Sequence, residues 1–416
     1  MACHHKVFHW QQRQNMILRE QILKQLQAKK ASLLAFEDEY QQEAQAYAKA
    51  LQALCQLSLP GLEARLARHE TCGALPTPEF EAEPEPCRHF VPQFGNHTEA
   101  RAWACDALLD HTIVAVDGSQ ILPSSESRIP LAAVQVAWFA NLHARAGRYR
   151  KEIAFELLAP EVLLGDGQGE QQFSEQAVSF QRFRLEVETL CRVMREIAAD
   201  AAQMRKLPLA FFDSSIVISF VEQLHDGLRQ QYIDLVLRLL RCSEETRVPV
   251  VGYVATSHAR DLAKLLSVCF DLREAERVHD AQLLSAAMAW GARSPFYICA
   301  RGSARKNQKS VLESFGEYRR QVGFVYLKTS AAAPPARLEI PLWVYEAGLL
   351  EEVLNLVRAE VIVGNGYPYA LETADATAVI SGRDHEAFYE ILQRFADAEG
   401  LALRVSPKSA SKARRR

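Results

Sequence analysis

The chain has 416 residues, of which 49% are hydrophobic and 24% are charged, and this composition is typical of an ordinary globular protein with room for two to three domain-sized units. The formal net charge of -3 gives no global attraction to nucleic acid, so any such binding must come from local basic patches. Nine cysteines without a Cys-x-x-Cys pair argue against a disulfide framework or a structural zinc site.

We expect no targeting segment at the N-terminus. It begins Met-Ala-Cys-His-His-Lys, without the apolar core of a signal peptide, and no stretch approaches about 18 consecutive apolar residues. We therefore expect a cytoplasmic protein that does not enter a membrane. Cys3, His4 and His5 are metal-ligand types, but three adjacent ligands cannot close a site, so we interpret them as an ordinary chain end.

Residues 1–71 are predicted to form a long helix or a helical hairpin. No proline occurs from residue 10 until Pro60, and apolar or small residues recur in steps of three and four at Leu33, Phe36, Tyr40, Ala44, Tyr47, Leu51 and Leu54. This period indicates an amphipathic helix with a seam like that of a coiled coil. We expect the region to serve packing, dimerisation or docking.

A proline-rich and acidic segment follows. Residues 72–98 carry prolines at positions 76, 78, 84, 86 and 92 among several glutamates, a composition that cannot hold a long helix or a central strand. We interpret this segment as a linker. It separates the helical region from a catalytic domain at 99–404, which ends in a basic tail at 405–416.

Strands and helices alternate in the catalytic domain. Strands are predicted at 113–117, 131–141, 149–158, 207–213, 248–255 and 296–300, with a hairpin formed by 323–328 and 337–344. Helices are predicted at 100–109, 180–197, 224–240, 259–266, 346–359 and 384–399. This order predicts an α/β domain with helices on a mixed sheet. A glycine-rich loop at 165–169 is too short for a Walker A motif.

Two of the predicted strands end on an aspartate. The apolar run from Ile113 ends at Asp117, before Gly118-Ser119, and the run from Leu207 ends at Asp213, before two serines. Asp-Gly alone is a common turn, but the repeated pattern favours a functional site. Two such acids side by side repel each other unless cations hold them.

Further acids complete the candidate set. On the helix at 180–197, Glu186 lies at the border of the apolar face and Glu188 points to solvent, so Glu186 is the better candidate, with an ordinary surface glutamate as the alternative. Asp375 is expected at the start of a late helix, eight positions after Tyr367. Helix capping and aromatic packing are the alternatives for these two residues.

Hard oxygen ligands of this kind are what metal-assisted phosphodiester cleavage requires, because two cations about 4 Å apart activate water and stabilise the leaving oxygen. The sequence therefore predicts a metal-dependent phosphodiesterase. An aspartyl phosphotransferase is disfavoured because the first strand lacks an Asp-x-Asp pattern. Basic residues that we consider for contacts with a nucleic-acid backbone are Arg182, Arg184, Arg260 and Lys264.

Four motifs in order resemble the NurA family of DNA repair nucleases, over about residues 110–395. They are Val116-Asp117-Gly118-Ser119, Phe212-Asp213-Ser214-Ser215, Gly252-Tyr253-Val254-Ala255-Thr256-Ser257 and the segment from Gly366 to Asp375. The resemblance implies an RNase H-like core and a Mn²⁺-dependent 5′ to 3′ exonuclease with single-strand endonuclease activity, which processes DNA double-strand break ends by two-metal hydrolysis. It also implies a homodimer and a HerA-type hexameric ATPase as partner.

The same resemblance implies the site residues and shows where this chain departs from the family. The metal site would be formed by Asp117, Glu186 (or, less well, Glu188), Asp213, Tyr367 and Asp375. Ser214 stands where the family commonly has glycine. His258, with Arg260, stands where a Lys or Arg follows the serine. Asp375 stands where the family also uses histidine, which would make the site harder and more tolerant of Mg²⁺. Asp280 is expected to be supporting structure.

These departures keep open a second hypothesis of a different class. A non-catalytic adaptor would use its N-terminal helices to dock on the ATPase ring and would guide DNA without cutting it. Cleavage of labelled single-stranded DNA in the presence of manganese separates the two hypotheses, because an adaptor binds without cutting.

Overall fold

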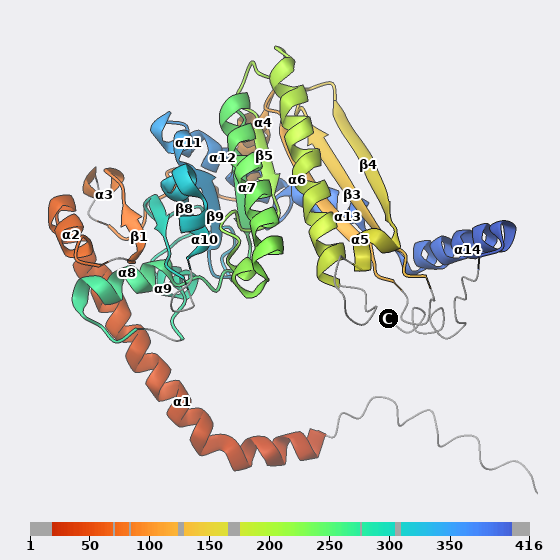
Figure 1. Cartoon of the computed structure of the whole chain (residues 1–416). Helices are drawn as coiled ribbons and strands as arrows, with labels where there is room; N and C mark the ends of the chain where they lie inside the picture. The colour runs from red at the N-terminus through yellow and green to blue at the C-terminus, as the bar shows by residue number, and fades with distance from the viewer. Residues whose placement is uncertain are drawn as a thin grey trace, which may run out of the picture.

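A nine-stranded mixed sheet forms the centre of the computed structural model, which describes residues 19–69, 71–82, 85–123, 129–164, 175–274, 277–303 and 309–401 (Figure 1). Within these residues the sheet order is β1-β7-β8-β9-β6-β5-β2-β3-β4. The strands are β1 (Gly73–Pro76), β2 (Ile113–Ile121), β3 (Ala132–Asn141), β4 (Tyr149–Leu158), β5 (Leu209–Phe212), β6 (Val250–Val254), β7 (Tyr297–Ala300), β8 (Val322–Leu327) and β9 (Ala336–Pro341).

The sheet is parallel only at its centre. β2 pairs in parallel with β5, and β5 in parallel with β6, while β2, β3 and β4 form an antiparallel meander. Parallel neighbours need crossover connections, and long helices in the chain between these strands supply them. The predicted RNase H-like mixed sheet flanked by helices is confirmed.

Helices cover both faces of the sheet. They are α1 (Arg19–Leu54), α2 (Leu59–Leu66), α3 (Glu79–Ala82), α4 (His97–Leu108), α5 (Pro160–Leu164), α6 (Glu175–Ala199), α7 (Asp226–Thr246), α8 (Asp261–Phe270), α9 (Asp280–Ser285), α10 (Val311–Ser314), α11 (Leu342–Glu346), α12 (Leu350–Val363), α13 (Tyr369–Ala378) and α14 (Gly382–Glu399). One core packs α1, α2, α6, α7 and α8 on one face, and a second core packs α4, α11, α12 and α13 on the other (Figure 1).

The predicted long N-terminal helix is confirmed as α1, and the shorter α2 follows it, capped by the Ser58 side chain. The C-terminal half of α1 buries Tyr47, Leu51 and Leu54 against α8 and α9. Its N-terminal half extends away from the rest of the fold (Figure 1). There the helix exposes large apolar side chains.

The segment 72–98 is more than the linker that its composition predicted. It contributes β1, an edge strand paired with β7, and α3. Glu79 accepts hydrogen bonds from the Arg293 side chain and the Phe296 backbone N–H, which ties the segment to the sheet. An edge strand needs one hydrogen-bonded partner only, so Pro76 at its end is tolerated. The domain boundaries themselves stay predictions.

Two other element boundaries differ from those predicted. β9 ends at Pro341, and the chain continues as α11 rather than as strand to residue 344. α12 begins at Leu350 instead of residue 346, because Gly348 adopts a positive φ of 72° that interrupts the helices. The Cys3-His4-His5 group, the loop at 165–169 and the basic tail at 405–416 lie outside the described residues. No described helix meets the length and apolarity needed to span a membrane.

A buried ionic network joins three elements beside the end of β6. Arg337 on β9 is 2% exposed, and its guanidinium lies 2.7 Å from Asp261 on α8 and 2.8 Å from Glu339. Burial alone would raise the pKa of Asp261, but Arg301 and Arg337 lower it. Glu339 also accepts hydrogen bonds from Ser215 and the Val217 N–H, so the network reaches the loop after β5.

We expect Arg337→Leu to lower the free energy of unfolding by about 3 kcal/mol, because it leaves buried Glu339 without its cation and leaves Asp261 with Arg301 alone. Urea unfolding measures this change. The control is Arg394→Leu, which removes an exposed pair with Glu390 and should cost less than about 0.5 kcal/mol. Equal effects of the two substitutions would contradict the role of the buried network.

Candidate functional site

Asp117 and Asp213 lie next to each other at the centre of the sheet. The parallel ladder between β2 and β5 ends with Val116 opposite Phe212, and the two aspartates are the next residue on each strand. Alternate residues of both strands contribute to the core with α12 and α13, so strand alternation turns both aspartates toward that face. The acids that sequence reasoning paired are therefore brought together by strand register.

The position of Asp117 differs from the prediction in one respect. It was expected at a strand end, with Gly118 starting a turn, whereas β2 continues to Ile121. Asp117 lies opposite Ala137 of β3, in the middle of an unbroken antiparallel ladder. The turn interpretation is wrong because β3 supplies the hydrogen-bond partners for the whole length of β2. Asp213, in contrast, follows β5 directly, as predicted.

Helix α13 brings two more candidates to this face. The Tyr367 hydroxyl, just before the helix, donates a 2.8 Å hydrogen bond to Asp213 Oδ1. Asp375 lies close enough to Asp117 for its carboxyl group to raise the pKa of that aspartate. Asp375 is not at the helix start, because α13 begins at Tyr369 and places this acid in its second half. The helix-start prediction was wrong since Pro368 already supplies the N-terminal boundary.

Backbone contacts fix α13 on the strands. The Ser119 hydroxyl donates to the Ala378 carbonyl oxygen, and Gln135 Nε2 donates to the same oxygen at 3.1 Å. Both β2 and β3 therefore hold the C-terminal end of the helix. Because Asp375 lies one turn before Ala378, these bonds set its position relative to Asp117.

Glu186 approaches from the opposite face of the sheet, where Gly118 leaves room. A Cβ on Gly118 would collide with Glu186 Oε1 and lie 2.9 Å from Arg182 Cγ, both on α6. Arg182 Nη1 donates a 2.9 Å hydrogen bond to the Gly118 carbonyl oxygen and lies 3.7 Å from Glu186 Oε1. The absence of a side chain at Gly118 thus lets α6 bring one carboxylate and one guanidinium up to β2.

Glu188, the weaker alternative, takes part in other interactions. It lies 2.8 Å from Arg184 and 3.1 Å from Arg238, away from β2. Two residues apart on a helix is roughly 200° of rotation, so Glu186 and Glu188 cannot face the same neighbour. The geometry favours Glu186 as the helical acid.

The acids near β2 carry raised pKa values. Burial raises the pKa of Glu186 to about 7, with Arg182 opposing the change and Asp117 adding to it. Burial also raises the pKa of Asp117 to about 6, and the carboxyl group of Asp375 and the charge of Asp213 add to that. Loss of surrounding water raises the pKa of Asp213, which Tyr367 partly offsets. Burial raises the pKa of the Tyr367 hydroxyl, and the charge of Asp213 adds to this effect.

These acids differ from two other acids of the chain, Glu339 and Glu351, although the pKa of buried Asp280 is also raised. Glu339 and Glu351 each lie beside arginines that lower their pKa values against the effect of burial. Among the residues that the structure describes, the guanidinium with an ion pair to one of the acids near β2 is that of Arg182, at 3.7 Å from Glu186. The site concentrates negative charge that side chains only partly neutralise.

The donor set fits a hard divalent cation, because carboxylate oxygens are the ligands that Mg²⁺ and Mn²⁺ prefer. Asp117 lies beside Asp213 and also beside Asp375. In the part of the chain that the structure describes, however, no three His, Cys, Asp or Glu side chains already converge as a metal-binding group. Neutralisation of the shared charge is what a bound cation would supply here.

Comparison with models of known families identifies the family of this chain. A family model of the NurA domain matches residues 111–380, more than half of the chain. The chain belongs to the NurA family. The match begins just before β2 and ends just after α13, so it contains Asp117, Glu186, Asp213, Tyr367 and Asp375.

Solved structures with low sequence identity are also similar. A crystal structure of NurA with manganese has 11% identity and a TM-score of 0.41, covering 70% of this chain and 89% of that chain. NurA bound to dAMP and manganese has 13% identity and a TM-score of 0.33, covering 65% and 85%. Endonuclease V from Bacillus subtilis has 10% identity and a TM-score of 0.31, covering 67% and 82%. A search of curated proteins finds no match.

The remaining NurA motif lies beside the site rather than in it. A Cβ on Gly252 of β6 would lie 2.8 Å from the Ser214 carbonyl oxygen, so this glycine lets the loop after Asp213 pass closely. His258 and Arg260 line a separate groove of about 1290 Å³ with Lys264. Lys264 is paired with Glu274 there. Asp280 accepts hydrogen bonds from the first N–H groups of α8, a supporting role.

Arg182 is the basic candidate that the structure places beside the acids, whereas Arg184 is held by Glu156 and Glu188. Sequence reasoning missed the part played by Gly118, which it considered only as half of a possible Asp-Gly turn. A glycine inside a long strand often marks the close approach of another element, and that signal could have identified it.

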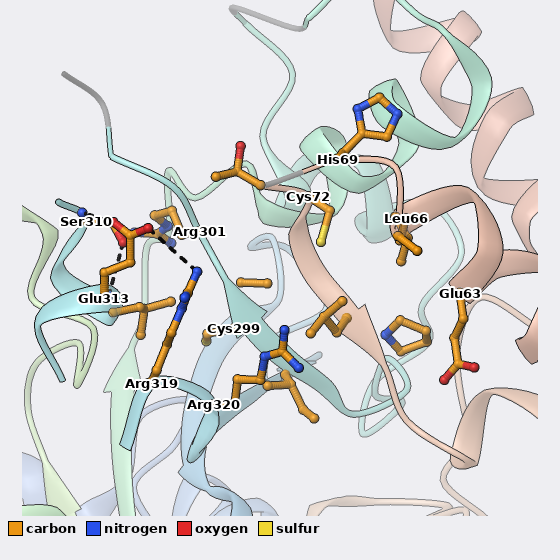
Figure 2. Close-up of a pocket in the computed structure, with 17 residues that line it drawn as sticks. Glu63, Leu66, His69, Cys72, Cys299, Arg301, Ser310, Glu313, Arg319 and Arg320 are labelled. Carbon is orange, nitrogen blue, oxygen red and sulfur yellow. Dashed lines mark hydrogen bonds and ion pairs between the residues drawn. The ribbon is translucent and has the colours of Figure 1, made fainter. Parts of the chain in front are cut away.

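A different cavity lies against the paired strands β1 and β7, at the β1 edge of the sheet, with α2 and α10 beside it (Figure 2). Its volume is about 470 Å³, and its lining includes Cys72, Arg301 and Arg319. Two of its arginines are in ion pairs, Arg301 with Asp261 and Arg319 with Glu313. This cavity contains none of the acids near β2.

We expect Asp117→Asn to stabilise the metal-free protein at about pH 7.5 by about 1 kcal/mol and to have little effect at about pH 3.5. The folded-state pKa is raised from 3.8 to about 6, so ionisation of Asp117 costs stability as pH rises through that window. Thermal and urea unfolding in chelator measure the change. The control is Asp384→Asn, because the pKa of Asp384 is lowered and its loss should give no gain at neutral pH. Destabilisation by Asp117→Asn at neutral pH would contradict the assignment.

Proposed function

We propose that this NurA-family chain is a metal-dependent deoxyribonuclease in which Asp117, Glu186, Asp213 and Asp375 hold divalent cations. The observation that carries the proposal is the gathering of these acids from β2, α6, β5 and α13, with pKa values of about 6 for Asp117 and about 7 for Glu186. A fold that needed only stability would pair such acids with arginines, as it does for Glu339. Unneutralised acids in a cluster are typical of a cation site.

Bound cations would supply Lewis-acid activation of water and charge stabilisation at the phosphate. The chain's own residues would position the reacting groups. The Tyr367 hydroxyl orients Asp213 through its hydrogen bond. Arg182 Nη1 is anchored on the Gly118 carbonyl oxygen, and the side chain is 39% exposed, which supports the proposal that its guanidinium contacts a substrate phosphate.

The finer activities follow from family membership. We propose a Mn²⁺-preferring 5′ to 3′ exonuclease with single-strand endonuclease activity that processes DNA double-strand break ends. An aspartate at position 375, where histidine is the family's other choice, supports tolerance of Mg²⁺ because carboxylate is the harder ligand. A HerA-type hexameric ATPase is the proposed partner, and the active form is proposed to be a homodimer in the cytoplasm.

We expect Glu186→Gln to lower kcat for Mn²⁺-dependent cleavage of labelled single-stranded DNA by at least about 100-fold, because the substitution removes a ligand charge. Glu188→Gln is the matched control. It lies on the same helix but pairs with Arg184 and Arg238, so it should change kcat by less than about 2-fold.

Two outcomes of this experiment would refute the proposal. One is full activity of Glu186→Gln. The other is wild-type protein that binds the DNA but leaves it intact with Mn²⁺, which would favour the adaptor hypothesis. Chelation with EDTA should abolish wild-type cleavage, and added Mn²⁺ should restore it.

We expect Tyr367→Phe to lower kcat about 10-fold with little change in KM, since loss of one hydrogen bond of about 1.4 kcal/mol frees the orientation of Asp213. Steady-state kinetics on the same substrate measure both constants. Tyr389→Phe removes a hydroxyl that donates to the Leu122 carbonyl oxygen and serves as control. A lower kcat in both variants would point to general loss of structure instead.

A further inference from the structure

A groove lies between α8 and the short 3-10 helix η1 (Ser219–Gln223), which follows Asp213 in the chain. Its volume is about 1290 Å³, and it reaches residues 301–303 after β7. Sites for small molecules usually enclose about 300–1,000 Å³. A groove of this size therefore suits a short stretch of a polymer better than a single small molecule.

The η1 wall of the groove is joined to the helix that carries Glu186. The ring of Phe220 on η1 packs edge-on against Tyr232 at 5.3 Å, and Tyr232 packs against Phe183 of α6 at 4.9 Å. Burial raises the pKa of Tyr232 to about 12, and the charges of Arg182 and Glu186 also act on it, so both lie near its hydroxyl. The Tyr232 ring thus bridges Phe220 and the turn of α6 that approaches β2.

The same wall is held in a fixed position relative to Asp213. Residues 216–218, between Asp213 and η1, are buried in the core. Arg301 donates a 3.2 Å hydrogen bond to the Ser219 hydroxyl at the start of η1. The groove and the acids are therefore parts of one connected surface.

Phe220 presents an apolar ring to this groove. It is 47% exposed although it packs against Tyr232. An exposed aromatic ring that is held by a second ring can stack on a nucleobase, and it needs no particular base because every base has a π face. Bases in a duplex are already stacked on one another, so this contact favours a single strand.

The α8 wall carries cations. Arg260, just before the helix, and Lys264, in its first turns, both line the groove. Lys264 lies 3.1 Å from Glu274, whose side chain is 69% exposed. An exposed ion pair of this kind is weak, so a phosphate can replace Glu274 as the partner of Lys264. The other acids of the lining, Glu222 and Asp261, are buried.

We propose that this groove binds single-stranded DNA beside the acids, with a base stacked on Phe220 and backbone phosphates in contact with Arg260 and Lys264. The inference rests on the proposed function for the choice of DNA as the ligand. Binding in the groove itself requires neither a metal ion nor cleavage.

The first test measures binding of a fluorescein-labelled strand of about 15 thymidines to the full chain by fluorescence anisotropy in EDTA, where no metal-dependent cleavage takes place. Phe220→Ala should weaken binding by at least about 5-fold, and Phe220→Trp should preserve it. Phe220→Leu keeps an apolar side chain against Tyr232 but offers no stacking face, so it should bind as weakly as Phe220→Ala. The matched control is Phe395→Ala, which removes an exposed ring on α14 and should leave the affinity unchanged.

The second test separates phosphate contacts from stacking through the salt dependence of binding. Arg260→Ala with Lys264→Ala should reduce the slope of log K against log salt concentration by about 1.4, because each phosphate contact to a single strand contributes about 0.7. Phe220→Ala should leave this slope unchanged. Arg394→Ala is the control, because Arg394 pairs with an exposed glutamate as Lys264 does.

Photocrosslinking locates the strand directly. A strand that carries 5-iodo-deoxyuridine, which couples to stacked aromatic rings, should crosslink to Phe220, and mass spectrometry of the digested chain identifies the residue. Three results would overturn the proposal. These are unchanged affinity in Phe220→Ala, crosslinks that all lie outside the groove, and a duplex of the same length that binds as tightly as the single strand.

Cleavage assays with Mn²⁺ distinguish failure of this inference from failure of the proposed function. A chain that binds the strand through Phe220 but does not cut it would refute the nuclease and support the groove. A chain that cuts the strand, with the same KM in the groove variants as in wild type, would refute the groove alone.

Discussion

Repulsion between carboxylates brought together by strand register is the constraint on which the centre of this structure depends. The parallel pairing of β2 with β5 forces Asp117 and Asp213 into adjacent positions, and α13 adds Asp375 on the same face. Burial and mutual charge then raise the pKa of Asp117 to about 6. The fold tolerates this cost because the strands are held by neighbours on both sides, so the acids cannot move apart.

The chain contains a second charged centre, in which an arginine neutralises the buried acids. Arg337 compensates Asp261 and Glu339 in a fully buried network, where both acids have lowered pKa values. Glu339 extends the network to Ser215 and Val217, the residues that follow Asp213 along the chain. The Arg337 network thus supports the loop that follows Asp213. This support holds Asp213 in position without neutralising its charge.

Gly118 connects the two faces of the sheet. Asp117 and Gly118 are consecutive and point to opposite faces, so the first carries an acid toward α13 and the second leaves space for Glu186 and Arg182 of α6. A larger residue at this position would push α6 away from β2. The space that Gly118 leaves is therefore what lets Glu186 come close to the strand that carries Asp117.

The sequence by itself determined the order and type of most elements. Apolar runs with β-branched residues marked the central strands, and the period of α6 separated Glu186 from Glu188, since both signals are local. It also showed which acids stand out from their neighbours in the chain. Composition alone misjudged residues 72–98, where an edge strand tolerates prolines because its outer side needs no partner.

Only the tertiary structure decided what those acids do to one another. Asp117 lies inside β2 and not at its end because β3 pairs with the whole strand, and Asp375 reaches Asp117 from the second half of α13 because β2 and β3 hold the end of that helix. Strand register, helix placement and the pKa values that result depend on residues hundreds of positions apart. Local periodicity carries no information about such contacts, so the sequence identified the acids and the fold determined their interaction.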